Sequence, residues 1–421
     1  MTRDEVLKAM TCSLRAGQTM LESSVSVSDV TEVMLRLTRA FGLQHCEVSI
    51  TLNTITVCDL PLDEPPVTMV KVVDISEPRL DRLTAIETVT NQVEQGELGL
   101  EAAYDRIGEI EHSEVPYPAW LTFLATLLSV AGWVVFAGGG LVAAAAGVVG
   151  ALVMYPLVRW VGRFHLPVLV GTFIGGMVVV LVPNAFLAAG VGIALVPAVI
   201  GGLYPLLPGG ALVASVIDGL SGAPISSLAK GLQAAVVALV LGLGVATAQA
   251  LTRYLELEGD TNDVTVPFAG LLVATAVAIG ALAVARGMTV SALLPTTALA
   301  VGAWLLVYFA PTRGIGGNAA TAAAAGAIGL GGQLLARLQR MPGTIYTTSA
   351  VYVLVPGTAI YLAMTGFALG DSEVASQELF NALRTATAIA GGIAVGVGLG
   401  RSVPAPRPRV SLFGRTRSRP R

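Results

Sequence analysis

Charged residues are scarce in this 421-residue chain, and most of them lie near its two ends. Only 13% of the residues are Asp, Glu, Lys or Arg, whereas 54% are hydrophobic and the mean hydropathy is +0.74. This composition excludes an ordinary soluble protein and is typical of a membrane protein. Residues 1–115 are the polar exception, and their net charge of −11 argues against a nucleic acid as partner.

Cysteine and histidine are also rare, with three residues of each type. Cys12, Cys46 and Cys58 show no Cys-x-x-Cys spacing, and the histidines are scattered. This pattern indicates reduced cysteines and no metal site. The glycine-rich stretches lack the following Lys-Ser/Thr pair of a phosphate-binding loop. We therefore expect no catalytic residue, no bound metal and no cofactor.

Long apolar runs fill residues 116–400. A membrane-spanning helix needs about 20 apolar residues, and ten segments reach that length between short polar or proline-containing stretches. These segments are 117–137, 140–158, 166–184, 187–207, 228–250, 266–285, 288–309, 316–335, 345–367 and 380–400. The sequence therefore predicts a multi-pass α-helical membrane protein with about ten transmembrane helices.

One apolar pattern occurs twice. The stretch 203–220 (LYPLLPGGALVASVIDGL) recurs 148 positions later as 351–368 (VYVLVPGTAIYLAMTGFA). Both copies contain a Pro-Gly pair, and paired helix breaks in two halves point to a substrate site because they free backbone groups to bind a solute. Five segments in each half force the second half to enter the membrane upside down, which gives a 5+5 inverted repeat.

The basic residues predict the orientation in the plasma membrane. If both termini are cytoplasmic, thirteen Lys and Arg residues lie inside and three outside. The expected parts are a cytoplasmic α/β domain (1–115), a first membrane half (116–251), an outer linker (252–265), a second membrane half (266–400) and a basic disordered cytoplasmic tail (401–421). The tail either attracts anionic lipids or only fixes the topology.

The N-terminal segment 1–115 has the patterns of a small α/β domain. Apolar residues recur with helical spacing in some stretches and alternate in others. Asp29, followed by Glu32, has the spacing of a helix cap. The expected elements are helices over 3–22, 29–42, 80–95 and 98–112, a hairpin over 47–57 and a strand over 67–75.

Several blocks of this sequence resemble the threonine/serine exporter family. They are LRAGQTML (14–21), VSDVTEVMLRLTRAFGL (27–43), RLDRLTAIETVTNQVEQGELGLEAAYDRIGEIE (79–111), the stretch from Pro208 to Asp218, and ARLQRMPGTIYTTSAVYVLVPGT (336–358). The resemblance implies export of L-threonine and L-serine driven by the proton motive force. Some two-chain relatives are associated with dicarboxylate export, so a succinate-type substrate is the alternative. Ala214 stands where many members have an asparagine.

The Pro-Gly pairs are the first candidate site. Half-helices that begin there would direct free N–H groups and a positive dipole end at a substrate carboxylate. The alternative is that these pairs only end helices or allow close packing. The substrate-binding candidates are Pro208, Gly209, Gly210, Pro356, Gly357 and Thr358.

Asp218 is the candidate for proton coupling, because it is the sole carboxylate between 116 and 250. A charge at bilayer depth costs about 2.5 to 3.5 kcal/mol, so one that is retained there suggests a function. Alternatively, Asp218 lies in a cytoplasmic loop and caps a helix. The expected partners are a small amino acid, protons and membrane lipids, with a homo-oligomer left open. A competing hypothesis makes residues 1–115 a membrane-anchored sensor or enzyme.

Overall fold

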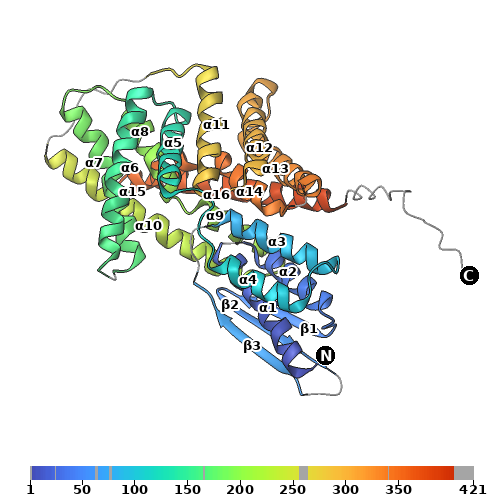
Figure 1. The fold of residues 1–421 in the computed structure, drawn as a ribbon. Coiled ribbons are helices and arrows are strands. Elements are labelled where there is room, and N and C mark those ends of the chain that lie inside the picture. The colour runs from blue at the N-terminus through green and yellow to red at the C-terminus, as the bar shows by residue number, and fades with distance from the viewer. Residues whose placement is uncertain are drawn as a thin grey trace, which may run out of the picture.

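The computed structural model describes residues 2–23, 25–61, 65–74, 78–164, 166–255, 264–339 and 341–402. They form an N-terminal region, residues 2–111, and a larger helical body, residues 119–402 (Figure 1). Most of the expected tail (403–421) and most of the expected outer linker (256–263) lie outside the described residues.

The N-terminal region combines four helices with a small antiparallel sheet. Its strands pair in chain order, β1-β2-β3. The elements are α1 (Arg3–Glu22), α2 (Val27–Ala40), β1 (Cys46–Thr51), β2 (Thr54–Asp59), β3 (Val67–Val72), α3 (Leu80–Glu94) and α4 (Leu100–Glu111). Helices and strands therefore occur where the apolar spacing predicted them, although the sheet has only three short strands.

Helix α2 begins earlier than the sequence predicted. Its N-cap is Ser26, whose hydroxyl accepts a hydrogen bond from the Asp29 backbone N–H at 3.2 Å. Asp29 lies in the first turn instead, where a negative charge interacts favourably with the helix dipole. Serine and aspartate are about equally good caps, so the prediction of Asp29 as the cap was wrong by three residues.

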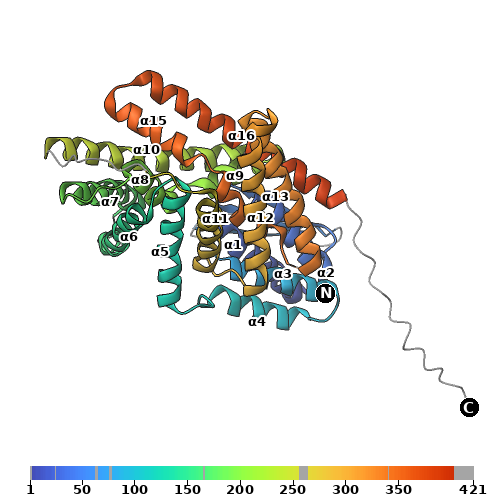
Figure 2. The same cartoon turned by 90° about the horizontal axis from the view of Figure 1, so that it is seen from above.

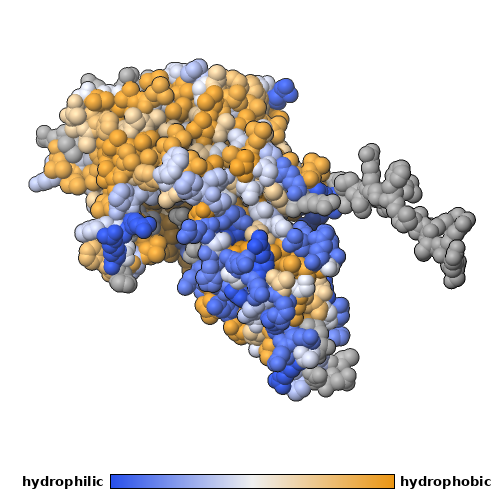
Figure 3. All heavy atoms as spheres, viewed as in Figure 1, coloured by the Kyte–Doolittle hydropathy of each residue, from blue (hydrophilic) through white to orange (hydrophobic). Residues whose placement is uncertain are grey.

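Eight helices of the described chain are long and apolar enough to cross a membrane. Apolar residues cover the helical body in Figure 3, whereas hydrophilic residues cover much of the N-terminal region. The eight helices are α5 (Ala119–Phe136), α6 (Leu141–Gly162), α7 (Val168–Ala188), α10 (Pro224–Tyr254), α11 (Phe268–Ala285), α12 (Val290–Phe309), α13 (Gly317–Gln339) and α16 (Ser372–Ser402). The chain is thus a multi-pass helical membrane protein.

Two expected spans, 187–207 and 345–367, are not continuous helices, and each is associated with a Pro-Gly pair. Pro208 directly follows the first span, and Pro356 lies within the second. In the first, α8 (Leu195–Leu203) and η1 (Tyr204–Leu206) stop before Pro208, and α9 (Gly209–Leu220) follows. In the second, α14 (Gly343–Ala350) and η3 (Val351–Leu354) stop before Pro356, and α15 (Gly357–Leu369) follows at a bend of 51°. Ten continuous spans were expected. The described residues contain eight, or nine if the bent pair counts as one.

The order of helices in 119–254 recurs in 268–402. Helices α5, α6 and α7 begin 149 residues before α11, α12 and α13, and α8, α9 and α10 begin 148 residues before α14, α15 and α16. The long final helices α10 and α16 both have 31 residues. The spacing of the repeated sequence pattern therefore extends, within one residue, to the starts of all six helices.

Helices α5 and α11 are neighbours that run in opposite directions. The Tyr117 hydroxyl, just before α5, donates to the Met288 carbonyl, just after α11, at 2.6 Å. Further along, the Ser129 hydroxyl donates to the Ala278 carbonyl at 3.0 Å. Gly132 permits this packing, because an added Cβ would lie only 2.7 Å from the Ala278 nitrogen.

The hydrophobic core of the N-terminal region extends into the second half of the helical body. This core includes Met288, Ala292, Ile345 and Tyr346 from the α11–α12 turn, α12 and α14. The Leu80 backbone N–H also donates to the carbonyl of Arg286, the C-cap residue of α11, at 3.1 Å. Figures 1 and 2 both show α1–α3 on the same side of the molecule as α12 and α13 and away from α6 and α7.

Candidate transport site

The two Pro-Gly breaks touch each other across the halves of the helical body. Tyr204, in η1 before the first break, donates from its hydroxyl to the Val355 carbonyl of the second break at 3.3 Å. The ring of Tyr204 also covers Gly357, where an added Cβ would lie 3.0 Å from the ring. The structure therefore brings Gly357 and its flanking backbone next to the segment that leads to Pro208.

A tyrosine precedes each break, and each tyrosine ring is held by a large side chain. The indole of Trp133 on α5 stacks on Tyr204, with ring centroids 4.0 Å apart and an angle of 3°. The guanidinium of Arg286 lies 4.4 Å from the ring centroid of Tyr352 and donates to its hydroxyl at 2.8 Å. These contacts fix the η1 and η3 turns, from which the chain enters the breaks.

Three buried polar atoms near the breaks have no hydrogen-bond partner among the described residues. They are Arg286 Nη1, Ser349 Oγ and Gln249 Oε1. The amide nitrogen of Gln249, on α10, donates to the Tyr361 and Thr365 hydroxyls of α15 at 3.3 and 3.4 Å. Buried polar groups are nearly always paired, so these two donors and one carbonyl acceptor lack the partners that such groups normally have.

The candidate residues of the breaks lie at helix starts. Pro208 and Pro356 are the N-cap residues of α9 and α15, and no side chain caps either helix. Gly209 and Gly357 are the first helical residues. Thr358 follows on α15 with an exposed side chain. Helix starts without a side-chain cap leave N–H groups and the positive dipole end available.

Asp218 does not lie at the breaks. It is fully buried at the end of α9, 2.6 Å from the ammonium of Lys230 on α10, which is 3% exposed. The Val27 backbone N–H, at the start of α2, donates to the same carboxylate at 2.8 Å, and Lys230 donates to the Val25 carbonyl at 3.3 Å. Asp218 thus joins α9 and α10 to the N-terminal region.

Sequence reasoning missed Lys230 as the partner of Asp218. The two residues flank the turn between α9 and α10, twelve positions apart, and a positive and a negative charge isolated in one apolar stretch could have indicated the pair. The contact with α2 had no such signal, because α2 lies about 190 residues earlier in the chain.

The start of α2 also contacts α16. The guanidinium of Arg401, near the end of α16, lies 3.2 Å from Asp29 and 3.4 Å from Glu32. Burial raises the pKa of the Asp29 carboxyl, although the Ser26 hydrogen bond and Arg401 oppose this effect. Helix α2 therefore contacts α9 of the first half, through Asp218, and α16 of the second half, through Arg401.

Comparison with known proteins identifies the family. The profile of a family described as "Putative threonine/serine exporter" matches residues 11–252, and one described as "Threonine/Serine exporter, ThrE" matches 271–403. The chain belongs to the threonine/serine exporter family.

Two relatives of this family match nearly the whole chain. The "Threonine/serine exporter" of Corynebacterium glutamicum is 26% identical over 407 residues, which cover 93% of this chain and 82% of the relative. The "Probable threonine/serine exporter" of Mycobacterium tuberculosis is 26% identical over 403 residues, with coverage of 92% and 75%. Both are named as exporters and not as enzymes. No solved structure matches the chain.

Proposed function

We propose that this protein exports small amino acids of the threonine and serine class across the plasma membrane. The observation that carries the proposal is the contact between the two Pro-Gly breaks, through Tyr204 and Gly357. Carriers built from two repeats bind their substrates where such broken helices meet. The names of the relatives suggest the substrate class.

The proposed architecture is a 5+5 inverted repeat with halves at 116–251 and 266–400, joined by an outer linker. The shared helix order and the antiparallel contact of α5 with α11 support an inverted relation of the halves. The bias of basic residues favours a cytoplasmic N-terminal domain (1–115) and a cytoplasmic tail (401–421).

The substrate would bind at the starts of α9 and α15. The residues Pro208, Gly209, Gly210, Pro356, Gly357 and Thr358 form these starts. Each helix dipole would stabilise a substrate carboxylate by about 0.3 to 1 kcal/mol, or about 2 kcal/mol when partly buried. The unpartnered Arg286 Nη1 and Gln249 Oε1 supply a further donor and an acceptor, which suits a zwitterion.

Proton coupling would act through Asp218. Protonation removes its charge and leaves the Lys230 ammonium buried without a counter-charge, a state that costs about 3–5 kcal/mol. Separation of α9 and α10 from α2 would admit water and relieve this cost. We therefore propose that protonation of Asp218 favours opening of this junction and that deprotonation closes it.

Counterflow in proteoliposomes tests the transport proposal. Proteoliposomes that contain the purified protein would be preloaded with unlabelled L-threonine, L-serine or succinate and diluted into the same compound in labelled form. Liposomes without protein are the control. Uptake of both amino acids and not of succinate is the expected result. Counterflow of succinate alone would identify a dicarboxylate carrier, and absence of counterflow for all three would contradict the proposal.

The variant Asp218→Asn tests the coupling step separately. It should lose uphill efflux driven by a pH gradient and keep counterflow, because exchange of substrate for substrate requires no net proton release. Vesicles with and without an imposed gradient provide the measurement. Gradient-driven efflux at the parental rate would show that Asp218 has only a structural role.

A further inference from the structure

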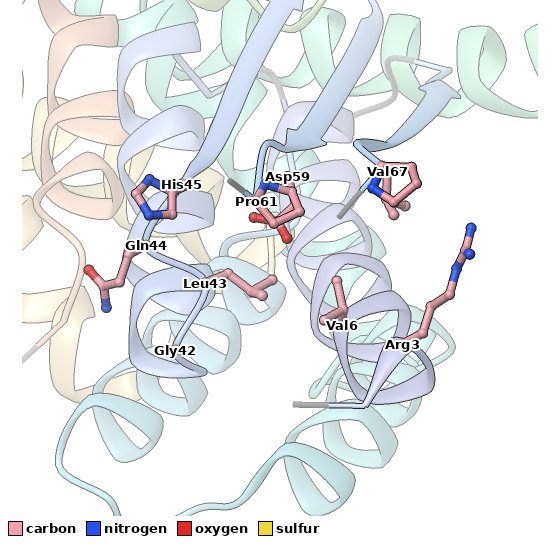
Figure 4. A pocket seen from close by; sticks show the side chains of 10 residues that line it. Arg3, Val6, Gly42, Leu43, Gln44, His45, Asp59, Pro61 and Val67 are labelled. Carbon is pink, nitrogen blue, oxygen red and sulfur yellow. The ribbon is translucent and has the colours of Figure 1, made fainter. Parts of the chain in front are cut away.

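The N-terminal region contains a cavity of about 350 Å³, far from the Pro-Gly breaks. Figure 4 shows it between the first turns of α1, the loop after α2 and the ends of β2 and β3. Its walls include apolar side chains of Val6, Leu43 and Val67. The opposite end of the sheet contacts the helical body, where the Leu52 N–H donates to Ser226 Oγ at 3.1 Å. A six-residue strand therefore separates the cavity from that contact by about 20 Å.

A buried carboxylate faces this cavity. Asp59 ends β2 on the same face as Ile55 and Val57, which are fully buried. Only 6% of the surface of Asp59 is exposed. Figure 4 shows its oxygens directed into the space beside Val6 and Leu43. Within the described residues, no hydrogen bond or ion pair to its side chain is present.

Such a carboxylate needs a partner. An ionised carboxylate only accepts hydrogen bonds, and the Asp59 oxygens are not among the fully enclosed side-chain atoms of the described residues. Their donors must therefore enter through the cavity. Asp59 is the acidic residue of a sheet face that is otherwise apolar at Ile55 and Val57. The carboxylate is therefore best explained by a ligand that supplies donors and a positive charge.

We infer that this cavity binds a small molecule through its primary ammonium group, held by Asp59. The volume lies at the lower end of the range for small-molecule pockets, which suits a metabolite of a few heavy atoms and excludes a nucleotide or a peptide. The negative charge of Asp59 disfavours a simple anion. Arg3 and His45 also line the cavity and could engage a carboxylate on the same molecule.

Two sources of this chemistry remain, an amino acid and a simple amine. Hydrogen exchange of the full-length protein in detergent can distinguish them, with L-threonine, 1-amino-2-propanol and N-acetyl-L-threonine as probes. The first two carry the ammonium group, and the third does not. We expect slower exchange in peptides covering 42–46 and 57–61 with the first two probes and no change with the third.

Substitutions connect this protection to the cavity. Asp59→Asn should weaken the apparent affinity for both amines by at least about tenfold, since it removes the negative charge that strengthens the hydrogen bonds to the ammonium group. The matched control Asp74→Asn changes an exposed aspartate near the end of the same sheet and should bind as the parent does. If L-threonine binds more tightly than 1-amino-2-propanol, and Arg3→Gln removes the difference, the ligand is an amino acid. If the two probes bind equally, the ligand is a simple amine.

The outcome does not depend on transport. Gly357→Leu should keep the protection at 42–46 and 57–61, because it alters only the breaks. Unchanged exchange with both amines, or protection that persists in Asp59→Asn, would overturn the inference. Exchange of α2 without ligand checks that each variant is folded.

Discussion

The buried pair of Asp218 and Lys230 should hold the start of α2 against α9 and α10. In Lys230→Met, the Asp218 carboxylate remains buried and keeps only the N–H of Val27. Loss of one partner of a buried pair costs about 3–5 kcal/mol. At about 1.4 kcal/mol per factor of ten, local opening should become more frequent by roughly two to three and a half powers of ten.

Hydrogen exchange at residues 27–30 measures this opening, because local opening of a docked segment exposes its amides. The double variant Asp218→Asn/Lys230→Met is the matched test. The asparagine oxygen can still accept from Val27, and no charge remains buried, so the double variant should exchange nearly as slowly as the parent protein.

The exposed contact of Arg401 with Asp29 and Glu32 provides the control. The side chain of Arg401 is 53% exposed, and surface pairs of this kind contribute about 0–1 kcal/mol. Arg401→Gln should therefore change exchange at 27–30 by less than about tenfold. The role assigned to the buried pair would be refuted if Lys230→Met also changed exchange at 27–30 by less than about tenfold. It would equally be refuted if the double variant exchanged as fast as Lys230→Met.

Three further predictions concern the breaks, the topology and pH. Gly357→Leu should abolish counterflow in an inserted protein, because a side chain would collide with Tyr204; Gly391→Leu, at a glycine with open space around it, should transport normally. An impermeant thiol reagent added outside cells should label Val264→Cys and not Gly162→Cys, and labelling of both would contradict the inverted arrangement. Because burial raises the pKa of Asp29, its stabilising contribution is present below pH about 3.9 and is lost as pH rises. Asp29→Asn should therefore unfold at a higher temperature than the parent at pH 7 and at the same temperature below pH 3.9; a lower one at pH 7 would contradict the sign.

The apolar runs of the sequence predicted the long helices well. Segments such as 266–285 and 288–309 agree with α11 and α12 within about two residues, because turn residues and charges end an apolar run sharply. The runs failed at 187–207, which includes the turn at Gly190 between α7 and α8, and at 345–367, which includes the bend at Pro356. Hydropathy stays high across both changes of direction, whereas glycine and proline mark them.

The candidate site was predictable only in part. The Pro-Gly pairs could be found because they recur in the sequence, and the structure places the second of them against Tyr204. Their role in binding stays a prediction. The junction at Asp218 depends on α2, whose contact with α9 and α10 results from tertiary packing and leaves no pattern in the local sequence.

The shared hydrophobic core has a consequence for biosynthesis. The N-terminal region is made first, but its core includes Met288, Ala292, Ile345 and Tyr346. At about 5–20 residues per second, the ribosome needs roughly ten to fifty seconds to proceed from the end of α4 to the end of α14. During that interval the apolar surface that later meets α11–α14 is uncovered beside the membrane. Maturation of this protein therefore ends with a docking step, and a chain that stops before α14 exposes a surface that chaperones and proteases recognise.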